Sequence, residues 1–174
     1  MLSKEDAAGI ASRARVFLAI RKTLMLATAD MGDRAGNPTA SYAPFVREGT
    51  HFYIYVSTLS AHTHELRKTR KAGVLVIEDE EDAKNNLFAR TRISCFCVAT
   101  VVKREGEEWQ RIMREFQMKF GKVFDMILPL QDFILFSLTP YETLYIEGFG
   151  RAYQMDADLS NPVHVRRAGH TVKK

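Results

Sequence analysis

The stretch from residue 38 to residue 66 constrains the fold most, because it contains two strand-like runs joined by a tight turn. The first run ends near Val46, and Gly49 supplies a turn residue that tolerates a positive φ. In the second run, residues 51–56, aromatic and β-branched side chains make both faces largely apolar. We therefore expect an antiparallel hairpin in the middle of a sheet.

The second strand of this hairpin ends in a dense row of hydrogen-bonding side chains. The row consists of Ser57, Thr58, Ser60, His62, Thr63 and His64. A helix N-cap at Ser60 explains one or two of these residues, but it does not explain all six. Polar clusters at the end of a buried strand often hold ligands, because the strand fixes their positions. The row is therefore a candidate binding site, with helix capping as the structural alternative.

The rest of the chain alternates short strand patterns with amphipathic helices. Helices are expected over residues 3–20, 60–70 and 106–120, and strands over 24–28, 73–78, 86–103, 133–138 and 144–153. Residues 123–130 are expected to form an apolar connection broken by Pro129. Because several strands adjoin through tight turns, the pattern predicts a mainly β fold with flanking helices, an antiparallel barrel rather than a doubly wound sheet.

A length of 174 residues indicates one domain, residues 1–174, with an N-terminal helix at about 3–20 and a C-terminal tail at about 154–174. The net charge of +4 is scattered, which argues against a nucleic acid partner and fits a small anionic ligand. No apolar run is long enough to span a bilayer, and the charged N-terminus does not resemble a signal peptide. Cys95 and Cys97 suit a reduced core, so the cytoplasm is the expected compartment.

Four residues stand out as candidates for chemistry. Arg90 and Arg92 are expected on the same face at the entrance of a predicted strand, where they would clamp a phosphate or carboxylate or else form surface salt bridges. Asp132 lies among apolar residues and needs a partner, either in a strand-end turn or helix cap or from an imidazole. His170 follows Gly169 in the tail. As a metal ligand it would need a carboxylate to orient its ring, and Asp132, of the same or a neighbouring subunit, is a candidate.

Several stretches together resemble one protein family. They are residues 41–45, 59–63, 77–79, 87–92, 130–133 and 148–153, with Gly169 and His170 near the end. In this order they resemble the haem-utilisation proteins of the HutZ/HugZ type, within the pyridoxamine 5′-phosphate oxidase-like, FMN-binding split-barrel superfamily. The resemblance extends from about residue 22 to residue 170.

This resemblance implies a six-stranded split barrel that forms a homodimer. It implies a haem-degrading oxygenase for iron acquisition, which opens the porphyrin ring with O2 and an electron donor to give a biliverdin-type product and iron. His170 would be the axial ligand of the haem iron and Asp132 its hydrogen-bonding partner, while Arg92 and Arg90 would face the anionic groups of the haem.

Two other functions are compatible with the resemblance. The first is an FMN-binding oxidoreductase, with Ser57, Thr58 and Thr63 among the flavin contacts. The second is haem storage or delivery without chemistry. The residues with which true pyridoxamine phosphate oxidases hold both phosphates are not visible in this sequence, which argues against that reaction.

Overall fold

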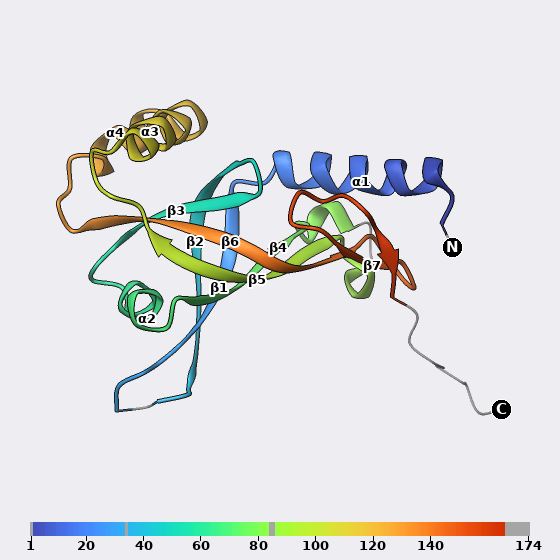
Figure 1. The fold of residues 1–174 in the computed structure, drawn as a ribbon, viewed down its shortest axis with the longest axis horizontal. Coiled ribbons are helices and arrows are strands. Elements are labelled where there is room, and N and C mark those ends of the chain that lie inside the picture. The colour runs from blue at the N-terminus through green and yellow to red at the C-terminus, as the bar shows by residue number, and fades with distance from the viewer. Residues whose placement is uncertain (1, 34, 84–85, 166–174) are drawn as a thin grey trace.

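The computed structural model describes residues 2–33, 35–83 and 86–165, which form one antiparallel sheet with helices outside it (Figure 1). The helices are α1 (Lys4–Ala19), α2 (Ala61–Thr69), α3 (Glu107–Phe120) and α4 (Lys122–Ile127). The strands are β1 (Thr23–Ala29), β2 (Pro38–Glu48), β3 (His51–Ser57), β4 (Lys71–Ile77), β5 (Arg92–Val101), β6 (Phe133–Ile146), β7 (Ala152–Met155) and β8 (Val163–His164).

Six of the strands close into a barrel. Their order is β3-β2-β1-β4-β5-β6, and β3 also pairs with β6. The long strand β6 makes this closure possible, because residues 133–138 pair with β3 on one edge and residues 136–146 pair with β5 on the other. Strands β7 and β8 then extend the sheet beyond the barrel from the far end of β6. The predicted six-stranded antiparallel barrel with flanking helices is confirmed.

One continuous strand, β6, replaces the two closing strands that the sequence predicts over 133–138 and 144–153. The apparent break falls at Pro140, which lacks an amide hydrogen for the ladder. The pairing with β5 shifts there, so that Phe96 faces Glu142 while Cys97 faces Pro140. A bulge of this kind accommodates proline, and the strand therefore continues through it.

Three further sequence predictions need correction. Strand β5 begins at Arg92 instead of residue 86, because a 3-10 turn at Leu87–Ala89 precedes it. The expected connection at 123–130 contains the short helix α4. This helix starts directly after Gly121, whose φ is 60°. Gly148, where a bulge or close backbone approach was expected, lies instead in the turn between β6 and β7, also with a positive φ.

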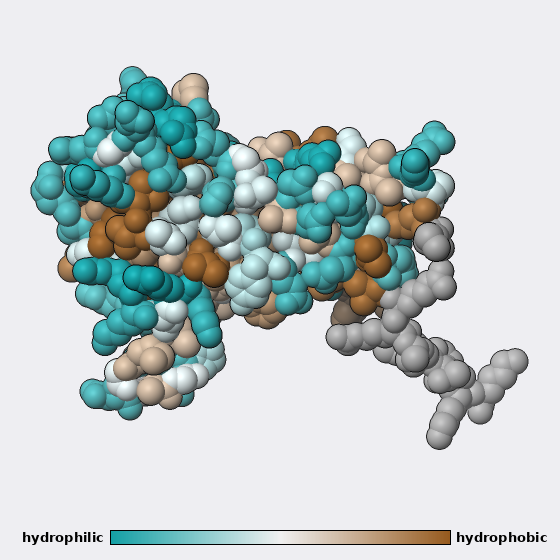
Figure 2. All heavy atoms as spheres, viewed as in Figure 1, coloured by the Kyte–Doolittle hydropathy of each residue, from teal (hydrophilic) through white to brown (hydrophobic). Residues whose placement is uncertain are grey.

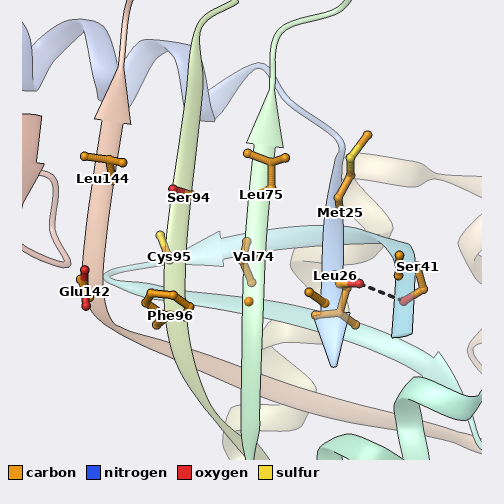
Figure 3. A pocket seen from close by; sticks show the side chains of 13 residues that line it. Met25, Leu26, Ser41, Val74, Leu75, Ser94, Cys95, Phe96, Glu142 and Leu144 are labelled. Atoms are coloured by element: carbon orange, nitrogen blue, oxygen red, sulfur yellow. Dashed lines mark hydrogen bonds between the residues drawn. The ribbon is translucent and has the colours of Figure 1, made fainter. Parts of the chain in front are cut away.

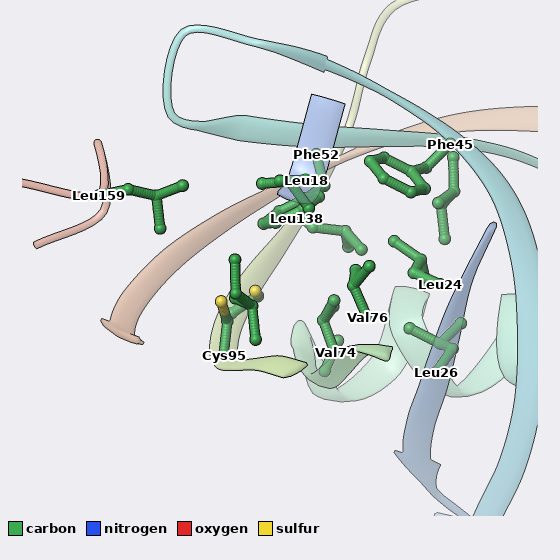
Figure 4. Packing of buried hydrophobic residues seen from close by; sticks show 14 of the residues in the cluster. Leu18, Leu24, Leu26, Phe45, Phe52, Val74, Val76, Cys95, Leu138 and Leu159 are labelled. Carbon is green, nitrogen blue, oxygen red and sulfur yellow. The ribbon is translucent and has the colours of Figure 1, made fainter. Parts of the chain in front are cut away.

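The barrel interior is filled by apolar side chains that alternate along the strands. Figure 4 shows Leu18 of α1 packed beside Phe52 and Leu138, with Leu24 among the residues that line the same core. Cys95 belongs to this cluster as a free thiol, and burial raises its pKa to about 11, so the thiol stays protonated and unreactive. This placement agrees with the expected reduced core cysteines.

Helix α1 lies along the barrel and is capped as the sequence predicts, since Ser3 Oγ accepts a hydrogen bond from the Asp6 amide at 3.0 Å. Arg13 ties α1 to the end of β6 through two hydrogen bonds to the Glu147 carboxylate, at 2.7 and 2.9 Å. In Figure 2 the surface around α3 and α4 is mostly hydrophilic, and hydrophobic residues form separate patches. Within the described ranges, no helix combines the length and the apolar character needed to cross a membrane.

Candidate functional site

Barrel closure brings Ser57 and Asp132 together. Ser57 ends β3 and pairs with Phe133, the first residue of β6, so Asp132 lies directly beside it. Ser57 Oγ donates to Asp132 Oδ2 at 2.7 Å, and the Thr58 amide donates to the Asp132 carbonyl at 2.7 Å. A hydroxyl bonded to a carboxylate at this distance is a strong, orienting hydrogen bond. The partner that Asp132 needs is thus Ser57 in this structure, and within the described ranges Oδ1 accepts no hydrogen bond.

Part of the polar row after β3 has a structural use. Thr63 Oγ1 donates to the Ser57 carbonyl at 2.6 Å, which holds the start of α2 against the end of β3. Ser60 occupies the N-cap position of α2, but its side chain makes no capping hydrogen bond. His62 is buried, and burial lowers its pKa, which favours the neutral ring. Flavin contacts from Ser57, Thr58 and Thr63 remain a prediction, and their bonds favour a structural role.

Arg104 anchors the loop that carries Asp132, and the sequence gives no local signal for this. Its guanidinium donates to the carbonyls of Leu128, Leu130 and Phe133 over 3.3–3.4 Å, and it lies over the Trp109 ring at 5.5 Å from the centroid. Three carbonyls held by one planar group restrict the backbone on both sides of Asp132. Arg104 is therefore a positioning residue for that carboxylate.

A second feature lies on the outer face of the sheet, where two rows of paired residues cross from β2 to β6. One row is Tyr42, Met25, Leu75, Ser94 and Leu144, and the other is Ala40, Ala27, Gly73, Phe96 and Glu142. Because Ala40, Ala27 and Gly73 have small side chains or none, the second row projects little from the sheet there. This leaves a hollow of about 500 Å³ with mostly apolar walls (Figure 3). Its size and apolar lining are typical of sites for organic ligands.

The two arginines lie beside this hollow, but in different ways. Arg92 shares the outer face of β5 with Ser94, and its Nη1 donates to the Arg90 carbonyl at 2.9 Å. Arg90 precedes the strand, so the prediction that both side chains share one face of the strand is wrong. Its Nε and Nη2 both donate to the Glu78 carbonyl, which closes the β4–β5 loop. Arg90 also lines an adjoining hollow of about 430 Å³ with Met25.

The described part of the tail folds back on the sheet at the far end of β6. Val163–His164 pairs with β7, and the Val165 amide donates to the Ala152 carbonyl at 2.8 Å. Ala152 pairs in turn with Ile146, the last residue of β6, whereas Asp132 precedes its first residue. The chain therefore leaves the sheet at the end of β6 opposite to Asp132 (Figure 1). His170 lies outside the described residues, so its contact with Asp132 stays a prediction.

Comparison with known proteins gives consistent matches. The family model for pyridoxamine 5′-phosphate oxidase matches residues 10–146. The chain is 40% identical over 151 residues to the haem oxygenase HutZ of Vibrio cholerae, which covers 86% of this chain and 83% of that protein.

Solved structures agree with this fold. The crystal structure of Vibrio cholerae HutZ, described there as a haem-storage protein, superposes with a TM-score of 0.74 at 34% identity, over 80% of this chain and 96% of that one. Campylobacter jejuni ChuZ superposes with a TM-score of 0.84 at 28% identity, over 96% of this chain and 66% of that one.

Proposed function

Since this chain belongs to the pyridoxamine 5′-phosphate oxidase family and, within it, to the group of the haem oxygenase HutZ, we propose that it binds haem and opens the porphyrin ring oxidatively. The observation that carries the proposal is the apolar hollow with arginines beside it, in a chain 40% identical to a haem oxygenase. Haem is a flat, mostly apolar ring with two carboxylates. Such a ligand suits a low apolar floor with cationic groups at one end.

Each of the candidate residues has a defined task in this proposal. Arg92 would bind the haem carboxylates, because its Nε and Nη2 make no hydrogen bond to the described residues. Arg90 would assist from the adjoining hollow, although part of its guanidinium is committed to the Glu78 carbonyl. Met25, Leu75 and Phe96 would contact the ring and keep water away from it.

His170 would be the axial ligand, with Asp132 accepting a hydrogen bond from the other ring nitrogen. This bond fixes the tautomer and orientation of the imidazole and makes it a more basic ligand. Because Ser57 already holds Oδ2, the remaining oxygen Oδ1 is the one available to the imidazole. When bound, haem supplies both the iron that reacts with oxygen and the ring that is opened, and the electrons come from a separate donor.

The path of β6 favours a site shared between two subunits of a homodimer. His170 is five positions beyond Val165, so the backbone between them reaches at most about 18 Å. The 14 residues of β6 extend over about 45 Å between the Asp132 end and the end where the tail leaves. In Figure 1 these two ends point in opposite directions along the long axis. His170 of one subunit would therefore meet Asp132 of another.

We also propose a cytoplasmic location, since both cysteines are free thiols buried in the core. Haem storage is the second candidate function, and it is favoured because the HutZ crystal structure is described as that of a haem-storage protein. The two functions differ in what happens after binding. A storage protein holds haem unchanged under reductant and air, whereas an oxygenase consumes it.

The direct test is a haem titration of the full chain, followed by ascorbate and air with catalase present. Saturable binding followed by loss of the Soret band and growth of a biliverdin-like band is the expected result. A stable Soret band would favour storage, and no saturable binding would refute both functions. His170→Ala should remove the normal Soret spectrum, and Asp132→Asn should leave haem bound but slow its breakdown.

Filling the hollow tests where haem binds. The Gly73 backbone does not require a positive φ, and a Cβ there would meet Ala27 Cβ at 3.4 Å, an ordinary contact. Gly73→Leu should therefore fold and place a side chain on the floor of the hollow. Overpacking typically costs 1–3 kcal/mol, so haem affinity should fall about 5- to 150-fold. Lys71→Leu, on the same face of β4 but outside this hollow, is the matched control and should bind haem normally.

A further inference from the structure

A cavity of about 520 Å³ lies between α1, β2 and α3, and it shares no residue with the hollows assigned to haem. Three cations line it, one from each element. They are Arg15 of α1, Arg47 of β2 and Lys119 of α3. The remaining wall is mostly apolar, with Leu18, Phe45 and Met118 among its residues, and Glu115 is the carboxylate in the lining.

The three cations donate only to backbone carbonyls in the part of the chain that the structure describes. Arg15 Nε donates to Asp158 at 3.3 Å, Arg47 Nη2 to Ala157 at 3.2 Å, and Lys119 Nζ to Phe45 at 2.9 Å. The Asp158 carboxylate is itself engaged by the Ser160 amide and hydroxyl at 2.9 and 2.6 Å. It is therefore directed into its own turn, and no ion pair joins it to these cations among the described residues.

Several arginines elsewhere in the protein are paired with carboxylates. Arg13 binds Glu147, and Arg111 binds Glu48 through two hydrogen bonds at 2.7 and 2.9 Å. The cavity is different, because its three cations converge without such a partner. Arg47 Nε is buried and has no hydrogen-bond acceptor among the described residues. A buried donor without an acceptor costs free energy, and a ligand that supplies the acceptor recovers it.

The electrostatics of the cavity favour an added negative charge. Burial lowers the pKa of Arg47 and the neighbouring Arg15 lowers it further, although Cys95 and Asp158 partly oppose this effect. Burial and the nearby Lys22 lower the pKa of Lys119. Both shifts mean that the charged forms of Arg47 and Lys119 are poorly solvated and are repelled by neighbouring cations. An anion placed between them would relieve both effects.

We propose that this cavity is a second ligand site, which binds a small organic anion through a phosphate or carboxylate group held by Arg15, Arg47 and Lys119. Arg47 presents its unused Nε to the anionic group, and Lys119 adds a compact charge from the opposite element. The apolar body of the ligand packs against Leu18 and Met118. The site is independent of the haem function, and its failure would leave that function untouched.

The test is calorimetric titration of the full chain with two probes, pyrophosphate for phosphates and citrate for carboxylates. Saturable binding of one probe, weakened by added salt, is the expected result, and the probe that binds identifies the chemical class. Arg47→Met should weaken it at least tenfold. If that variant does not fold, Lys119→Gln removes a cation at the other side of the cavity and should have a similar effect.

The matched control is Arg111→Met, which removes one positive charge from α3 outside the cavity. It should leave probe binding within about twofold of the parent protein. Absence of saturable binding for both probes would overturn the proposal. An equal loss of probe affinity in Arg111→Met would overturn it as well, because the attraction of the probe would then reflect the net charge of the protein alone. Haem titration of the same variants should be unchanged, which separates this site from the haem site.

Discussion

Subunit complementation tests whether the haem site is shared. One chain carries His170→Ala and the other carries Asp132→Asn, and different affinity tags allow the mixed dimer to be purified. In a shared site, the mixed dimer contains one site with both residues intact and one site with both residues changed. If the site lies within a subunit, each of the two sites has one defect. In both cases the unmodified dimer contains two equivalent sites, because a homodimer has two-fold symmetry.

The expected magnitude follows from this count. The purified mixed dimer should degrade haem at about half the rate of the unmodified dimer, because one of its two equivalent sites is intact. An unsorted equimolar mixture contains about half mixed dimers and should reach about a quarter of that rate. The lengths of the two segments support this outcome. The backbone from Val165 to His170 reaches about 18 Å, which is too short to return along the roughly 45 Å of β6 to Asp132.

The assay follows the Soret band under ascorbate and air, with each single-variant dimer measured beside the mixed dimer. A mixed dimer no more active than the better single variant would refute the shared site. A monomeric chain, with a mass near 19.8 kDa in solution, that still degrades haem would refute it as well. If Asp132→Asn alone retains full activity, the role of Asp132 is wrong, and the question of sharing does not arise.

Two other changes test the positioning contacts. Arg104→Met should cost about 1–3 kcal/mol in urea unfolding, because several bonds to carbonyls are lost; haem breakdown should slow more than haem binding weakens, and equal effects would contradict positioning. Burial raises the pKa of Glu147, but the hydrogen bonds and charge of Arg13, together with Arg151 and Tyr145, outweigh it and the net pKa is lowered. The stabilisation of the folded state by ionised Glu147 is therefore fully present above the pKa that Glu147 has in the unfolded chain. It is lost as the pH falls through the lower pKa of the folded state. Since Arg13 is 55% exposed, Arg13→Met should cost only about 0.5–1 kcal/mol at pH 7 and progressively less in acid, measured by thermal unfolding. A cost that grows with acidity would contradict this reasoning.

Local patterns in the sequence predict much of the fold. The hairpin with Gly49 in its turn appears as β2 and β3, and the apolar stripe of α3 is buried at Ile112, Met113 and Phe116. These features depend on side-chain spacing within one element. The continuity of β6 through Pro140 does not, because a bulge depends on the partner strand.

The candidate site depends on contacts that the sequence does not encode locally. Ser57 and Asp132 are 75 residues apart and meet only because β3 pairs with β6. The sequence correctly indicates that Asp132 needs a partner, but it does not identify Ser57. The hollow likewise requires Ala27, Gly73 and Ala40 to be in register across three strands. Composition and spacing within one strand cannot reveal that register.

The Ser57–Asp132 bond also bears on how Asp132 and His170, far apart in one chain, could both serve the proposed haem site. Asp132 is oriented before any imidazole arrives, by Ser57 at its carboxylate and by Thr58 and Arg104 at the backbone around it. A ligand supplied by another subunit would then meet a fixed acceptor, so less ordering remains to be done at assembly. The same strand that holds this acceptor at one end directs the tail away at the other. Under the proposed function, a site that needs both Asp132 and His170 would therefore form between two copies of the chain.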